Sequence, residues 1–148
     1  MDKNERLYNV LFPIWMLIIL PQTWLVIIPG NFLVDSIVLI IAMHALKLTD
    51  KKRFYLKHIL LVFVFGFVSD LLGALSILPL MFFELGGPMG DSPLITVPGL
   101  LIAAGLIFVL NYFVTFRKCE KVLKLRLALT FAIATAPYTF LIPTAWIY

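Results

Sequence analysis

Long apolar segments, separated by short polar ones, leave this chain very few possible folds. An α-helix rises about 1.5 Å per residue, so about 20 apolar residues are enough to cross a hydrocarbon core of about 30 Å. Because lipid offers no hydrogen bonds to an exposed backbone, each crossing segment has to be helical. The sequence therefore predicts an all-α integral membrane protein, a compact bundle of five transmembrane helices in a single domain (residues 1–148), with spans at about 7–28, 31–46, 59–83, 95–115 and 125–147.

Composition and patterning exclude the main alternatives. Hydrophobic residues make up 62% of the chain and charged residues 14%, against about 45–50% and about 25% in soluble domains. A soluble domain of this size would lack the polar residues needed to cover its surface. Strands of a membrane barrel alternate apolar and polar residues over about 10 positions, and the run 37–41 does not alternate. The apolar segment 7–28 is too long for a signal peptide and lacks a small-residue cleavage motif, so we expect a retained span.

Basic residues occur in only three clusters, and their placement predicts the orientation of the chain. With five spans, all three clusters lie on one face of the membrane, and the other face receives no Lys or Arg. The positive-inside rule then places the N-terminus in the cytoplasm and the C-terminus outside, in a multi-pass protein of the plasma (inner) membrane. Four or six spans would put some clusters outside. The twelve basic residues are Lys3 and Arg6; Lys47, Lys51, Lys52, Arg53 and Lys57; and Arg117, Lys118, Lys121, Lys124 and Arg126.

The first two spans leave an alternative open. Gly and Asn accept a positive φ and Pro fixes its own, so Pro29-Gly30-Asn31 predicts a tight turn. The segment 31–46 that follows spans only about 24 Å. It is either a short helix in a locally thinned bilayer or part of a re-entrant hairpin with a first segment broken at Pro13 or Pro21. Both return the chain to the same side, so the charge bias does not separate them.

Asp70 is the ionisable residue predicted to lie deepest in the membrane, near the middle of segment 59–83. Gly66 and Gly73 share its helical face, which indicates a close helix–helix contact. Intramembrane carboxyl groups are costly and often functional, so Asp70 is the first candidate for a proton- or ligand-binding group. A neutral acid that joins two helices is the alternative, and we favour it because no second carboxyl group is expected at that depth. Its candidate polar neighbours are Ser69, at the edge of the same helical face, and, by their depth, Thr135, Tyr138 and the backbone carbonyl freed by Pro137.

Asp35 is expected at a shallower depth, about 6 Å below the predicted outer turn. Gln22 and Thr23 are expected at a comparable depth, so the three residues are candidates for a polar pocket open to the outside. The alternative, which we favour, is a carboxylate that reaches interfacial water and fixes the hairpin. Since Asp35 and Asp70 are expected to differ in depth by roughly half a leaflet, the two are not predicted to act together in intramembrane proteolysis.

No motif for catalysis, a cofactor or a metal occurs in the sequence. It contains no phosphate-binding glycine loop, dinucleotide fingerprint or zinc-hydrolase motif. His44 and Cys119 have no second His or Cys at metal spacing, so no transition-metal site is predicted. The basic loops are too short and scattered for a nucleic-acid site. We therefore expect no cofactor, no metal, no nucleic-acid partner and, on balance, no enzyme.

The segment 51–73 resembles part of a known membrane family. Its basic residues are followed by Gly66, Asp70, Leu71 and Gly73 in the pattern G-x-x-x-D-L-x-G, which resembles the G-x-x-x-D-L-x-x-G region of MreD-type rod-shape proteins but is one residue shorter before the last glycine. Those proteins are similar in length and have five or six spans. The resemblance implies a scaffold role in cell-wall synthesis, and it assigns no role to any single residue.

The absence of a catalytic motif and of a soluble domain leads to a ranked set of functional hypotheses. We expect a subunit or scaffold of a larger membrane assembly, which contacts the lipid bilayer and either other membrane proteins or copies of itself. The first alternative is a small oligomeric transporter or channel with Asp70 as its midplane proton- or ion-sensitive group. The second is a lipid-handling enzyme that uses Asp35 from the outer leaflet.

Overall fold

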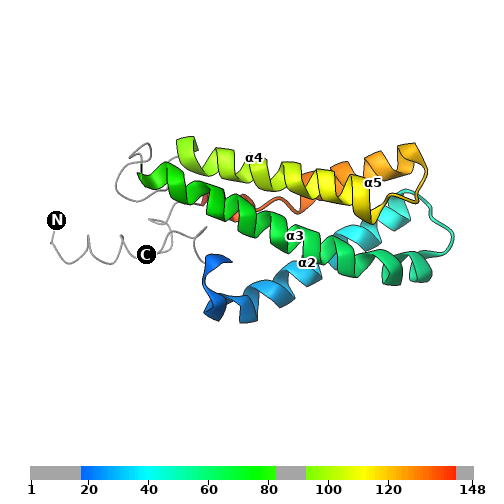
Figure 1. The fold of residues 1–148 in the computed structure, drawn as a ribbon. Coiled ribbons are helices and arrows are strands. Elements are labelled where there is room, and N and C mark those ends of the chain that lie inside the picture. Colours follow the sequence, from blue (N-terminus) through cyan, green and yellow to red (C-terminus); the bar gives the residue numbers. More distant parts are fainter. Residues whose placement is uncertain (1–17, 83–92, 143–148) are drawn as a thin grey trace.

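The computed structural model describes residues 18–82 and 93–142, and every regular element in these two stretches is helical (Figure 1). The predicted all-α fold is therefore confirmed. Three elements are short turns of 3₁₀ or π type, and four are α-helices. In chain order they are the 3₁₀ turn η2 (Pro21–Thr23), α2 (Trp24–Ala45), α3 (Lys51–Phe82), α4 (Pro93–Leu110), the π-helical turn η4 (Asn111–Thr115), α5 (Lys121–Ala134) and the 3₁₀ turn η5 (Tyr138–Leu141).

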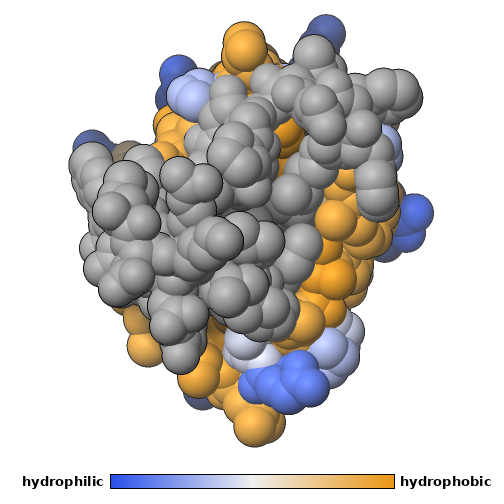
Figure 2. Space-filling view, turned by 90° about the vertical axis from the view of Figure 1, so that its left-hand side faces the viewer, coloured by the Kyte–Doolittle hydropathy of each residue, from blue (hydrophilic) through white to orange (hydrophobic). Residues whose placement is uncertain are grey.

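Three helical stretches are long and apolar enough to cross a membrane: Pro21–Ala45, Lys51–Leu80 and Pro93–Thr115. Side chains on the flanks of the molecule are mainly hydrophobic, as a view along its long axis shows (Figure 2). Exposed apolar surface of this extent is typical of a protein that resides in a membrane rather than in water. Helix α5 ends at Ala134, and residues 1–17 and 143–148 lie outside the described residues, so the count of five spans stays a prediction.

The tight turn predicted at Pro29-Gly30-Asn31 is wrong, because α2 continues through these residues. A proline inside a helix removes one hydrogen bond and strains the turn before it. A reversal of the chain would leave several backbone groups without hydrogen bonds, and in lipid this costs more free energy than the loss of one hydrogen bond. The helix therefore tolerates Pro29, and Asp35 lies near the middle of a long helix instead of near the start of a short one.

The connection between the spans predicted at 31–46 and 59–83 is also shorter than those bounds indicate, because α3 already begins at Lys51. Residues 46–50 make the connection after α2, and Lys47 within it has a positive φ of 52°. This connection and the one between η4 and α5 lie at the same end of the bundle (Figure 1). Two of the three basic clusters therefore share one end, which we call the basic end; the third, Lys3 and Arg6, lies outside the described residues.

Helices α3 and α4 lie side by side along most of their length (Figure 1), and two glycines make their close approach possible. A Cβ atom added to Gly73 would lie 2.8 Å from the carbonyl oxygen of Gly99 and 2.8 Å from Cβ of Ala103. A Cβ atom on Gly99 would lie 2.6 Å from the side chain of Ile77. Small residues let two helical backbones come close in lipid, where packing rather than exclusion of water drives association.

Two apolar clusters fill the bundle, one toward each end. The cluster at the basic end includes Phe116 and Phe131, whose stacked rings have centroids 6.1 Å apart. The other includes Ala74 and Ile77 of α3 together with Ile95 of α4. Along α3, the buried residue Asp70 lies between Val62 of the first cluster and Ala74 of the second.

The orientation of the chain is testable through Cys119, a free and partly buried thiol at the basic end. Burial raises the pKa of the Cys119 thiol, and Lys57 and Lys124 partly oppose this. Because the thiolate is the reactive form, we expect alkylation of Cys119 at neutral pH to be slower than that of a fully exposed cysteine. Below the pKa, the rate should rise about tenfold per pH unit. Removal of the positive charge in Lys57→Gln should slow the reaction further.

A membrane-impermeant maleimide, added to sealed vesicles of defined orientation, provides the measurement. Mass spectrometry should detect labelling at Cys119 only when the reagent is on the cytoplasmic side. Labelling from the outer side would overturn the predicted orientation. A rate that does not change with pH would contradict the raised pKa.

Candidate functional site

Two buried carboxyl groups face each other between α2 and α3. Asp35 is 3% exposed and Asp70 is 7% exposed. Gly66, one helical turn before Asp70, provides the space for Asp35: a Cβ atom added to Gly66 would lie 3.4 Å from Asp35 Oδ2. The structure therefore brings together two carboxyl groups that the sequence had placed at different depths. That prediction failed because it rested on the turn at Pro29–Asn31, which α2 does not make.

Asp35 and Asp70 line a common cavity of about 30 Å³. The rest of its wall comes from Asn31 and Val34 of α2, from Gly66 of α3 and from Thr135, which follows α5. A cavity of roughly 10–15 Å³ is enough for one water molecule when polar groups surround it. The cavity between the two carboxyl groups is therefore large enough and polar enough to hold water.

The hydroxyl groups predicted to serve Asp70 are bonded elsewhere. Ser69 Oγ donates to the carbonyl of Phe65 at 2.6 Å, and Thr135 Oγ1 donates to the carbonyl of Phe131 at 2.9 Å. Asp70 Oδ1 is left buried without a hydrogen-bond partner among the described residues. It shares this property with Asn111 Oδ1 and Thr115 Oγ1 of η4. The carboxyl group of Asp70, a residue that lines the cavity, thus retains an unsatisfied acceptor.

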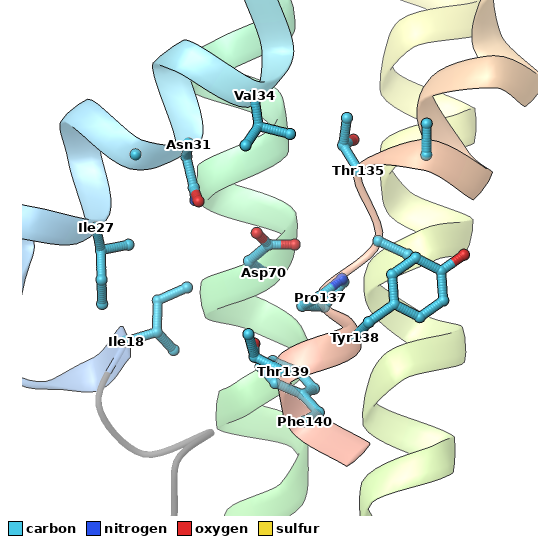
Figure 3. Close-up of a pocket in the computed structure, with 13 residues that line it drawn as sticks. Ile18, Ile27, Asn31, Val34, Asp70, Thr135, Pro137, Tyr138, Thr139 and Phe140 are labelled. Atoms are coloured by element: carbon cyan, nitrogen blue, oxygen red, sulfur yellow. The ribbon is translucent and has the colours of Figure 1, made fainter. Parts of the chain in front are cut away.

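A larger cavity of about 440 Å³ adjoins Asp70 (Figure 3). Asn31 and Val34 of α2 line one side of it, and the segment from Thr135 to Phe140 lines the other, with Asp70 between them (Figure 3). Helix α5 ends at Ala134, and Pro137 interrupts the chain before η5. This break opens the wall, so Asp70 contacts both cavities whereas Asp35 contacts only the smaller one.

Tyr138 lines the larger cavity but directs its hydroxyl group away from Asp70 (Figure 3). The hydroxyl donates to the carbonyl of Ile133 at 2.5 Å. Pro137 has no N–H to offer the residue four positions earlier, so this carbonyl is the one that the proline leaves free. The freed carbonyl exists as predicted, but Tyr138 takes it and Asp70 does not.

The outer pocket predicted from Gln22, Thr23 and Asp35 is not assembled. Gln22 is exposed, and Thr23 Oγ1 donates to the carbonyl of Leu20 at 2.7 Å. Both residues precede Asp35 by at least a dozen positions along η2 and α2, which corresponds to about 18 Å. The physical reason is again the continuous helix, which carries Asp35 away from the end where Gln22 and Thr23 lie.

The described residues offer little for a transition metal. Within 18–82 and 93–142, no group of three or more His, Cys, Asp or Glu side chains converges. Asp35 and Asp70 are the buried acidic residues of these stretches. Asn31 and Thr135 line the small cavity together with them.

No family model, no curated protein and no solved structure matches this chain. The resemblance of residues 51–73 to MreD-type proteins accordingly stays an expectation. A functional proposal for this protein therefore rests on the geometry of the carboxyl pair.

Proposed function

We propose that this protein is a proton-coupled membrane transport protein or channel subunit, and that Asp35 and Asp70 form its proton-binding site. The observation that supports this function is the buried carboxyl pair beside a water-sized cavity, with Asp70 Oδ1 unsatisfied. Ionisable groups inside membrane helices commonly mark the paths of protons and ions.

Like charges explain why such a pair would bind and release protons. Two carboxylates that share one poorly hydrated site repel each other strongly, so they do not both ionise there. The pair then titrates as a unit and holds at least one proton while it is closed off. When water reaches the site, that proton can leave. A site of this kind alternates between two charge states, which proton coupling requires.

The unsatisfied oxygen favours this function over a purely structural one. Buried polar groups that only hold a fold together are nearly always hydrogen-bonded. A neutral acid that served only to join α2 to α3 would be expected to use the hydroxyl groups at its depth. Ser69 and Thr135 instead bond to their own helical turns. The carboxyl pair therefore has capacity for a ligand such as water or a hydrated proton.

The two cavities favour transport over hydrolysis. A catalytic carboxyl pair has to present both groups to one substrate. Here the cavity of about 440 Å³ contacts Asp70 but not Asp35. A lipid-handling enzyme that worked through Asp35 would need that residue to be accessible, and it is almost completely buried.

The helices of residues 18–82 and 93–142 leave little room for a complete pathway, so we infer that the chain works as a subunit. The remaining helices would come from copies of the same chain or from another membrane protein. The scaffold hypothesis remains the second candidate, because the resemblance of residues 51–73 points to it.

Proton flux into proteoliposomes tests the proposed function. After a pH step with a permeant counter-ion, the wild-type protein is expected to acidify vesicles faster than empty controls. Asp35→Asn and Asp70→Asn preserve shape but remove ionisation, so each should reduce flux to the level of empty vesicles. Glu120→Gln makes the same chemical change at an exposed site and should leave flux intact.

A transporter that needs a second substrate would show no flux alone, so proton binding should also be measured directly. The infrared carbonyl stretch of a protonated carboxyl group reports the pair without any knowledge of the substrate. The band should disappear as the pH rises in the wild-type protein, and it should change in both Asn variants. Unaltered flux and an unaltered band in Asp70→Asn would rule out the proposed role.

A further inference from the structure

A separate cavity of about 410 Å³ lies at the basic end. Besides His58, its wall carries three Lys or Arg side chains, Arg53 and Lys57 from α3 and Lys118 from the connection before α5. A single carboxylate, Asp50, accompanies them. Lys57 precedes Asp70 by about 20 Å along α3, so this cavity is independent of the carboxyl pair and of the function proposed for it.

The starts of two helices add to the positive charge of this cavity. Helix α3 begins at Lys51 and α5 begins at Lys121, and their first turns contribute Phe54 and Leu123 to the wall. Free backbone N–H groups and the positive end of the helix dipole both favour an anion at a helix start. Three cations and two helix starts around one hollow therefore indicate an anionic ligand.

The surroundings of the cavity indicate that the anion belongs to a lipid. The candidate spans Lys51–Leu80 and Pro93–Thr115 begin and end at this level, so the cavity lies at the membrane boundary. Leu56 and Val122 precede the lining residues Lys57 and Leu123 in the chain, and they are 65% and 54% exposed. A lipid would place its phosphate among the cations and its acyl chains on these apolar side chains.

We propose that this cavity binds the phosphate group of an anionic membrane lipid, with Arg53, Lys57 and Lys118 as its ligands. Orientation of the chain during insertion requires basic residues on one side of the membrane. It does not require that residues from two separate segments converge on one hollow. Convergence of this kind is what recognition of a phosphate group needs.

Lipid titration in a neutral detergent tests this proposal, because the detergent removes the general surface potential of a membrane. Native mass spectrometry of the full chain should detect a bound phosphatidylglycerol and little phosphatidylcholine. Each basic residue contributes about fivefold to the attraction of an anionic headgroup. Lys57→Gln with Lys118→Gln should therefore weaken binding by about 25-fold.

Arg117→Gln with Lys121→Gln is the matched control, because it removes the same charge from exposed positions outside the cavity. It should change binding by less than about threefold. Equal losses in the two double variants would overturn the proposal, since net charge alone would then explain binding. Competition by inorganic phosphate at concentrations similar to the lipid would also overturn it, because the ligand would then be the free anion. Proton flux should be unaffected by either double variant.

Discussion

Leucine at position 73 is expected to separate α3 from α4 and to unfold the bundle at a much lower denaturant concentration. Gly73 packs directly on the backbone of α4, where an added Cβ atom would already lie 2.8 Å from the carbonyl oxygen of Gly99. Overpacking of a well-filled interior usually costs about 1–3 kcal/mol, and more when a backbone has to move. We expect the free energy of unfolding to fall by about 3 kcal/mol or more in Gly73→Leu.

Gly105→Leu is the matched control for this change. Gly105 lies on α4, one of the same two helices, but no atom outside its own stretch of helix lies within 4 Å of a Cβ atom added there. Both variants gain helix propensity from the loss of glycine, so the difference between them reports the α3–α4 contact. Unfolding in mixed micelles, followed by circular dichroism, provides the measurement. Equal stability of the two variants would show that the close approach of α3 and α4 does not stabilise the protein.

The helix contacts of α3 were predictable from the spacing of its glycines. Gly66, Asp70 and Gly73 were placed on one face of a helix, and that face does meet neighbouring helices. The sequence did not reveal that two different neighbours share it. Gly66 accommodates Asp35 of α2, whereas Gly73 accommodates α4 and the ring of Phe140. Periodicity identifies a contact face, but the partner depends on how the helices cross.

The depth of Asp35 was not predictable from turn chemistry. Proline, glycine and asparagine in succession indicate a turn in water, where a broken helix can bond to solvent. In lipid the same break leaves backbone groups unpaired, so the helix persists through Pro29. This one difference moves Asp35 to the level of Asp70. Treating 21–45 as one continuous apolar segment would have revealed the pair.

The hydrogen-bond partners of Asp70 were also mispredicted, for a local reason. Thr135 and Tyr138 are expected beside Asp70 because their depth in the membrane matches that of Asp70, and Ser69 because it lies at the edge of the same helical face. Side chains of serine and threonine in helices commonly bond to the carbonyl of the preceding turn, and both do so here. Thr135 and Tyr138 do line the cavity beside Asp70, as their depth predicts, but neither forms a hydrogen bond with its carboxyl group.

The two carboxyl groups are expected to differ completely in their reaction with a hydrophobic carbodiimide. Such a reagent partitions into apolar cavities and reacts with protonated carboxyl groups, whose oxygen adds to the carbodiimide carbon. Asp70 lines a largely apolar cavity of about 440 Å³, and Asp35 does not. The cavity that they share has only about 30 Å³, which is too small for the reagent. Modification should therefore occur at Asp70 and not at Asp35.

Intact-mass analysis and peptide mapping of the labelled protein provide the measurement. Asp70→Asn should abolish the adduct inside the membrane, whereas Asp35→Asn should retain it, because the route to Asp70 is unchanged. An adduct on Asp35, or equal labelling of both residues, would mean that both carboxyl groups face the larger cavity. That result would revive the catalytic alternative, because a carboxyl pair that presents both groups to one substrate-sized cavity is the arrangement that hydrolysis needs.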